Sequence, residues 1–259
     1  MSRFNVPVES FASSPVYTIA ADESLQSADR RMRTLSVSSL AVIDREGALV
    51  GVITRSDLVR IGRYRARARR GGPLLDFPDA PIADAMTRDV VTLSTRGTVA
   101  QACELMVRRH IHRVFTTDDG ALAGVFSTRD AMRAVCDQRL EDPIAAFMSS
   151  PLFTVDVGDS TALATEYLDR ARITGVVVVE SDWPVGVFTM SEAVFARALP
   201  ENTAVEEVMD AAVVCLPRDT PMFRAAHQAL RMGVRRIVVS HQRDMVGILS
   251  GMDFARAGR

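Results

Sequence analysis

The sequence contains no lysine, since all 31 basic residues are arginine, and it has only three cysteines and one tryptophan. Cys103, Cys136 and Cys215 are far apart and form no CxxC pair, which argues against a zinc site or a disulfide framework. Apolar runs such as residues 175–179 fall far short of the roughly 20 residues that span a bilayer. The N-terminus also lacks the basic-then-apolar order of a signal peptide. These absences predict a cytoplasmic protein with no membrane partner and no metal centre.

The balance of charge also excludes some functions for the chain as a whole. Thirty-one basic residues face 32 acidic ones, for a net charge of −1, so any affinity for nucleic acid must be local. Hydrophobic residues make up 47% and charged residues 24%, close to the average for globular domains. A length of 259 residues therefore allows one large domain or two modest ones with an ordinary apolar core.

The most informative feature present is a fourfold internal repeat. Four segments align in register: GVITRSDL from Gly51, GVFSTRDA from Gly124, GVFTMSEA from Gly186 and GILSGMDF from Gly247. Upstream of these glycines, at a distance of 32 or 33 residues, stand Thr18, Thr92, Thr154 and Cys215. A spacing held this closely indicates four copies of one structural unit.

Hydrophobic periodicity predicts the order β-α-β-β-α within each unit. In the second unit we expect strands at 90–93, 113–117 and 122–126, with a turn at 118–120 between the last two. Val99, Cys103 and Met106 mark one face of the first helix, and a second helix should run from Thr128 to about Arg139. Because so small a sheet cannot bury both of its faces, the units should pack in pairs.

These units resemble cystathionine β-synthase (CBS) domains, and two in tandem resemble a Bateman module. The resemblance rests on two apolar strands ending in Gly-apolar-apolar-Thr/Ser-x-x-Asp, and it covers about residues 10–254. It implies an α+β fold of four repeats in two modules: repeats at 1–72 and 73–140, then at 141–199 and 200–259. It further implies a flat four-repeat disc, formed either within one chain or by a homodimer. The resemblance leaves no room for a separate catalytic domain, so we expect a non-enzymatic protein with no required cofactor.

The same resemblance implies a ligand. CBS pairs often bind AMP, ADP, ATP, S-adenosylmethionine, NAD or a cyclic dinucleotide between repeats, and pass the bound state to a partner protein. We expect an adenine nucleotide here. The residues implied are Thr18, Thr54, Asp57, Thr92, His112, Arg113, Ser127, Arg129, Asp130, Arg235, Arg236, Ser250 and Asp253.

The Thr/Ser-x-x-Asp motif has two interpretations. It is a helix-capping pattern, in which the hydroxyl satisfies a free backbone N–H and the acid suits the positive helix end. A helix N-terminus with a hydroxyl and a carboxylate can equally hold a phosphate and a ribose diol. The third repeat has Glu192 in place of Asp and the fourth has Cys215 in place of Thr, so these two sites should be weaker.

Positive charge distinguishes the repeats further. At the start of the second strand, the even-numbered repeats carry His112-Arg113 and Arg235-Arg236, where the odd ones carry Ser39-Leu40 and Thr174-Gly175. Arginine pairs well with phosphate through its forked donors. We therefore expect basic residues of the even-numbered repeat to line one side of the cleft in each module. The strongest nucleotide site should lie in the cleft of repeats 1 and 2.

A segment rich in arginine provides an alternative function. Residues 60–70 hold six arginines and no acid. Such a run is either a solvated face or a surface that grips nucleic acid or an acidic partner. The alternative to a nucleotide sensor is thus a ligand-free scaffold that presents this segment.

Overall fold

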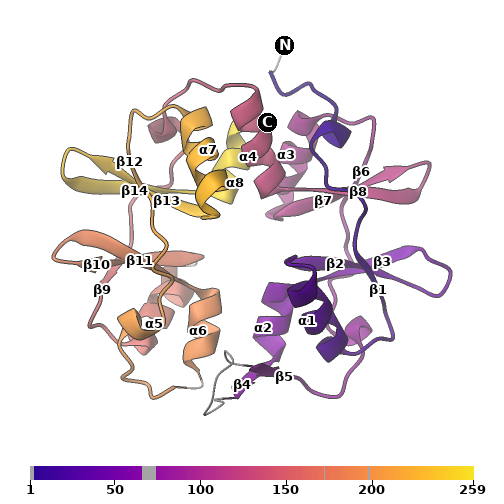
Figure 1. Ribbon diagram of the computed structural model, residues 1–259, viewed down its shortest axis with the longest axis horizontal. Coiled ribbons are helices and arrows are strands. Elements are labelled where there is room, and N and C mark those ends of the chain that lie inside the picture. The colour runs from indigo at the N-terminus through magenta and orange to yellow at the C-terminus, as the bar shows by residue number, and fades with distance from the viewer. Residues whose placement is uncertain (1–2, 66–73, 172, 198) are drawn as a thin grey trace.

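The computed structural model describes residues 3–65, 74–171, 173–197 and 199–259, and within them it contains four copies of one β-α-β-β-α unit (Figure 1). The predicted α+β class is confirmed. Figure 1 shows the four repeats as quadrants of a disc formed by one chain, with repeats 1 and 2 on one side and repeats 3 and 4 on the other. No described helix is long and apolar enough to cross a membrane.

The element bounds repeat with the sequence, and a short 3₁₀ helix (η) precedes the first strand of each unit. Repeat 1 comprises η1 (Val8–Ser10), β1 (Thr18–Ala20), α1 (Leu25–Thr34), β2 (Ser39–Ile43), β3 (Leu49–Thr54) and α2 (Arg55–Ile61). After it comes a hairpin of β4 (Arg63–Arg65) and β5 (Leu74–Asp76). Repeat 2 comprises η2 (Ile82–Asp84), β6 (Thr92–Ser94), α3 (Val99–Arg109), β7 (Arg113–Asp118), β8 (Ala121–Ser127) and α4 (Thr128–Asp137). Repeat 3 comprises η3 (Ile144–Ala146), β9 (Thr154–Asp156), α5 (Thr161–Ala171), β10 (Gly175–Glu180), β11 (Trp183–Thr189) and α6 (Met190–Ala196). Repeat 4 comprises η4 (Val205–Glu207), β12 (Cys215–Pro217), α7 (Met222–Met232), β13 (Arg236–His241), β14 (Asp244–Ser250) and α8 (Gly251–Ala257).

Each repeat has the same sheet topology. The first strand pairs in parallel with the second, and the second pairs antiparallel with the third, with an irregularity in the register of the hairpin. The predictions for repeat 2 agree with the structure apart from their ends. The first strand, predicted at 90–93, begins at Thr92, where the parallel ladder starts with the pair Thr92–Phe115. The last helix ends at Asp137, and Arg139 follows with a positive φ of 47°.

The glycine at the start of each repeated motif explains how the units pair. A Cβ atom at Gly247 in β14 would lie 2.8 Å from both Met148 Sδ and the Ser149 carbonyl oxygen, which lie between η3 and β9 of repeat 3. Backbone bridges join the segment between the 3₁₀ helix and the first strand of each repeat to the third strand of another repeat, as the pairs Ser13–Val125, Thr87–Val52, Ser149–Ile248 and Asp210–Val187. Repeats 1 and 2 therefore form module 1, and repeats 3 and 4 form module 2.

The two modules meet through a shared core in the half of the disc that contains repeats 2 and 4. Buried residues of repeats 2 and 4, including Met106, Val135, Ala226 and Phe254, belong to one hydrophobic cluster that joins α3, α4, α7 and α8. Repeats 1 and 3 instead have separate clusters of their own. In Figure 1, α4 lies against α7 and α8 in the upper half of the disc. Cys103 lies in this shared core, where burial raises the pKa of its thiol to about 12.

Candidate functional site

The hydroxyl and acid of each repeated motif form a capping box at the start of the last helix. In repeat 1, the Thr54 hydroxyl donates to Asp57 Oδ2 at 2.6 Å, and the Thr54 N–H donates to the same oxygen at 2.9 Å. The other three boxes are Ser127–Asp130, Thr189–Glu192 and Ser250–Asp253. The capping interpretation is therefore correct in all four repeats. A box of this kind leaves the second oxygen of the acid available for another partner.

That second oxygen differs in accessibility among the repeats. In three of them it faces an arginine three residues later, as the pairs Asp57–Arg60 (3.6 Å), Asp130–Arg133 (3.2 Å) and Asp253–Arg256. The Asp57 side chain keeps 14% of its surface exposed, that of Asp130 6%, and that of Asp253 1%. Asp253 Oδ1 also accepts from the Ser149 hydroxyl at 3.3 Å. Asp57 is thus the acid that a ligand reaches most easily among these three.

A basic cluster of four side chains from both modules lies near the starts of β7 and β13. Its members are His112, Arg113, Arg235 and Arg236. Burial lowers the pKa of His112, and the charges of Arg113, Arg236 and Arg235 lower it further. A cluster of like charges stabilises an anion placed among them and is otherwise unfavourable. The structure therefore brings together the predicted basic residues of repeats 2 and 4.

Arg113 connects the basic cluster with the acid of repeat 1. Burial, and to a smaller extent the charge of Arg235, lower the pKa of Arg113 to about 10, while the charge of Asp57 acts in the opposite direction. Within the described residues, Arg113 Nη1 is a buried side-chain nitrogen that has no hydrogen-bond partner. A buried donor without a partner costs free energy, so this atom is suited to an acceptor brought by a ligand.

The corresponding arginine of module 2 has protein partners instead. Arg236 Nη2 donates to the Thr174 carbonyl oxygen at 2.8 Å and to Thr174 Oγ1 at 3.1 Å. Its guanidinium lies over Gly175, where a Cβ would come within 3.0 Å of Nε. Burial lowers the pKa of Arg236, Arg235 lowers it further, and Glu192 opposes them. The two modules therefore differ at equivalent positions.

The remaining predicted residues lie at the edges of this arrangement. Thr18 and Thr92 start β1 and β6, and pair there with Ala41 and Phe115. Thr18 is half-buried, whereas Thr92 and Arg129 are exposed, the latter on the first turn of α4. Of the arginine-rich segment 60–70, residues 66–70 lie outside the described residues. In the part of the chain that is described, no group of three or more His, Cys, Asp or Glu residues could hold a metal ion.

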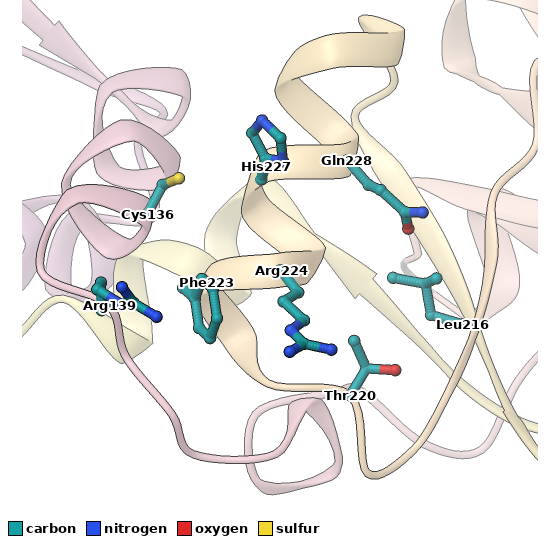
Figure 2. Close-up of a pocket in the computed structure, with 8 residues that line it drawn as sticks. All are labelled: Cys136, Arg139, Leu216, Thr220, Phe223, Arg224, His227 and Gln228. Carbon is teal, nitrogen blue, oxygen red and sulfur yellow. The ribbon is translucent and has the colours of Figure 1, made fainter.

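Sequence reasoning missed a groove of about 630 Å³ between α4 and α7 (Figure 2). None of the predicted site residues lines it. The groove joins side chains that are about 80 residues apart in the chain, such as Cys136 and Leu216, and the contact of the two modules creates it. The sequence does contain one indication of the groove, the adjacent residues Phe223 and Arg224, of which the arginine is exposed. These two residues are not part of the repeated motif, so the motif did not point to them.

Comparison with known proteins identifies the repeated unit. The model of the CBS domain family matches residues 8–63, 82–137, 144–198 and 205–259. An uncharacterised 17.7 kDa protein of Acidianus ambivalens is 29% identical over 131 residues, which are 50% of this chain and 73% of that protein. The inosine-5'-monophosphate dehydrogenase of Methanocaldococcus jannaschii is 30% identical over 119 residues, 46% of this chain and only 21% of the enzyme.

Two solved structures match over the length of the chain. Protein MJ1225 of Methanocaldococcus jannaschii, described as a candidate archaeal homologue of g-AMPK, is 16% identical with a TM-score of 0.76. An uncharacterised conserved protein of Pyrococcus horikoshii is 18% identical with a TM-score of 0.71. Each match covers 98% of this chain and 100% of the other. At these identities the matches establish the fold.

Proposed function

Because the chain belongs to the CBS-domain family, we propose that it is a non-enzymatic regulatory protein that binds an adenosyl nucleotide in the cleft of module 1. The observation that carries the proposal is Arg113 Nη1, a buried donor that has no partner among the described residues, in a side chain that is close enough to Asp57 of the paired repeat to feel its charge. A phosphate supplies the missing acceptor and at the same time offsets the charges of His112 and Arg235.

The roles of the other residues follow from their positions. Asp57 uses Oδ2 for its capping box, so Oδ1 is the atom that would accept hydrogen bonds from a ribose diol, in exchange for the 3.6 Å contact with Arg60. An exposed ion pair at such a distance contributes little, so its loss costs little. Thr54 holds the Asp57 carboxylate in place through the 2.6 Å hydrogen bond. Thr18 and Thr92, at the starts of β1 and β6, would lie toward the base.

We assign a weaker role to the other motifs. Asp253 is almost fully buried and bound to both Ser149 and Arg256, so a ribose would have to displace partners that stabilise the fold. Asp130 is nearly as buried, and Glu192 is matched by Arg236, which is already bonded to Thr174. In these three repeats the motif serves mainly to cap its helix, as in the alternative of a ligand-free scaffold.

Binding would change the contact between the modules through electrostatics. His112 and Arg113 belong to module 1, whereas Arg235 and Arg236 belong to module 2, and the like charges repel one another across the contact. A bound anion removes part of this repulsion and so favours a closer arrangement. A ligand that binds two arrangements with different affinity shifts their populations, which a partner protein can sense. The cytoplasmic location, the repeat bounds 1–72, 73–140, 141–199 and 200–259, and a partner protein remain parts of this proposal.

A thermal-shift panel with AMP, ADP, ATP, NAD, S-adenosylmethionine and a cyclic dinucleotide tests the function. A ligand at about 100 times its dissociation constant adds roughly 2.7 kcal/mol of stability. We expect one adenosyl ligand to raise the melting temperature of the parent and of the control Glu192→Gln, but not of Asp57→Asn. No shift with any ligand would reject the nucleotide and favour the scaffold.

A further inference from the structure

The groove between α4 and α7 has a composition that the nucleotide site does not explain. It lies where Arg139, just after α4 in module 1, approaches Phe223, Arg224 and His227 on the first turns of α7 in module 2 (Figure 2). Thr220 and Gln228 add a hydroxyl and an amide to its lining. No acidic side chain is among the described residues that line it. The groove is therefore lined by residues of both modules, and it presents positively charged hydrogen-bond donors.

Two arginines are held in place there by one aromatic ring. The Arg139 guanidinium carbon lies 5.3 Å from the centroid of the Phe223 ring, and that of Arg224 lies 5.8 Å from it. Figure 2 shows the two guanidinium groups on either side of the ring. Stacking fixes the plane of a guanidinium but leaves its N–H edge free for an anion. The ion pairs described for the chain include neither arginine.

The equivalent helix pair on the other side of the shared core provides a comparison within the same chain. There α3 and α8 take the places of α7 and α4, and the repeat register aligns Arg224 with Gln101 and His227 with Glu104. Glu104 forms ion pairs with Arg108 and, at 3.9 Å, with Arg259, which follows α8. That pair of helices thus supplies its own counter-charge. The groove between α4 and α7 has none among its lining residues, so an anionic ligand would supply there the negative charge that Glu104 supplies on the other side.

We propose that this groove binds a small molecule that carries two anionic groups, phosphates or carboxylates, one for Arg139 and one for Arg224. Two groups are required because the guanidinium groups lie on opposite sides of Phe223. Thr220 and Gln228 would hold the uncharged part of the ligand through hydrogen bonds. Because Arg139 belongs to module 1 and Arg224 to module 2, the bound molecule fastens the modules to each other. The site is separate from the nucleotide cleft and does not depend on it.

Titration calorimetry with pyrophosphate and with citrate tests the site on the full chain. We expect saturable binding of one of them, and the one that binds identifies phosphate or carboxylate as the preferred group. Arg224→Gln, which copies the residue of the equivalent helix, should weaken binding at least tenfold. The control Arg218→Gln changes an exposed arginine of the preceding loop that does not line the groove, and it should bind as the parent does.

Three results would overturn the proposal. The first is the absence of saturable binding for both probes. The second is an equal loss of affinity in Arg218→Gln, which would indicate only a diffuse attraction of anions. The third is a loss of binding in Arg113→Met with none in Arg224→Gln, because the probe would then occupy the nucleotide cleft. Since Arg224 is exposed, the Arg224→Gln variant should have the same melting temperature as the parent, which circular dichroism measures.

Discussion

Arg236 donates a hydrogen bond of 2.8 Å to the carbonyl oxygen of Thr174, whereas the Nη1 atom of its equivalent, Arg113, is buried and has no partner in the part of the chain that the structure describes. The two arginines occupy the same position in repeats 4 and 2. Repeat 3 provides Gly175 opposite Arg236, and repeat 1 has Leu40 at that position of its own second strand. One arginine thus serves the fold, and the other is available to a ligand.

This difference predicts opposite effects on the stability of the free protein. Arg236→Met removes two hydrogen bonds to Thr174 and should lower the free energy of unfolding by about 1 kcal/mol. Arg113→Met removes a buried donor that none of the described residues satisfies, so it should leave stability unchanged or raise it. Urea denaturation of both variants checks this. A larger loss in Arg113→Met would show that its guanidinium already has a structural partner.

The capping boxes allow the structural and the binding roles of the motif to be separated. Thr54→Val and Thr189→Val each remove a side chain that caps a seven-residue helix, and each should cost about 1 kcal/mol of stability. Only Thr54→Val should also weaken nucleotide binding, since Thr54 positions Asp57. Chemical denaturation and a binding titration on the same two preparations provide the comparison. Equal affinity in both variants would contradict the placement of the ligand in module 1.

His112 should make the stability of the free protein depend on pH below neutrality. The pKa of His112 lies below its usual 6.5 because of burial and of the charges of Arg113, Arg236 and Arg235. The unfolded chain therefore takes up a proton near pH 6.5 that the folded protein accepts only at lower pH. The contribution of neutral His112 to the free energy of unfolding is therefore fully present above pH 6.5, and it is lost as the pH falls through the pKa of the folded protein.

The matched variant isolates this contribution. His112→Gln should lose less stability than the parent between pH 7 and pH 5, measured by urea denaturation at both values. His241→Gln replaces another exposed histidine, at the end of β13 and outside the cluster of His112 with Arg113, Arg235 and Arg236, and it should behave as the parent does. A parent and a His112→Gln variant with the same pH profile would show that the cluster of arginines does not act on this imidazole.

The packing of the repeats can be tested at the motif glycine. Gly247→Ala places a Cβ 2.8 Å from the Ser149 carbonyl oxygen, which belongs to backbone and cannot move aside as a side chain would. We expect a loss of about 1 to 3 kcal/mol in the free energy of unfolding. Gly158→Ala is the control, because nothing lies within 4 Å of the added atom there. Comparable stability of the two variants would argue against the close contact of the segment between η3 and β9 with β14.

Much of this arrangement could be predicted from the sequence because it is local or repeated. The fixed spacing of the motifs gave the four units, and the pattern Thr-x-x-Asp gave the start of α2 and its capping box. The difference in hydrogen bonding between Arg113 and Arg236 depends on residues of another repeat. Gly175, which leaves room for the Arg236 guanidinium, was the one indication of it in the sequence. The exposed fraction of Asp57 compared with Asp253 could not be predicted, because it depends on contacts with another repeat, such as the hydrogen bond from Ser149 to Asp253.

The most direct test of the account is the affinity of AMP and ATP for the parent, Arg113→Met and Arg236→Met by titration calorimetry. A charge-assisted hydrogen bond is worth about 1.5 to 3 kcal/mol, so the loss of Arg113 should weaken binding by at least about tenfold. Arg236→Met should bind within a factor of about two of the parent, because Arg236 is already bonded to Thr174. Binding that survives in Arg113→Met and fails in Arg236→Met would contradict the assignment of the nucleotide to module 1.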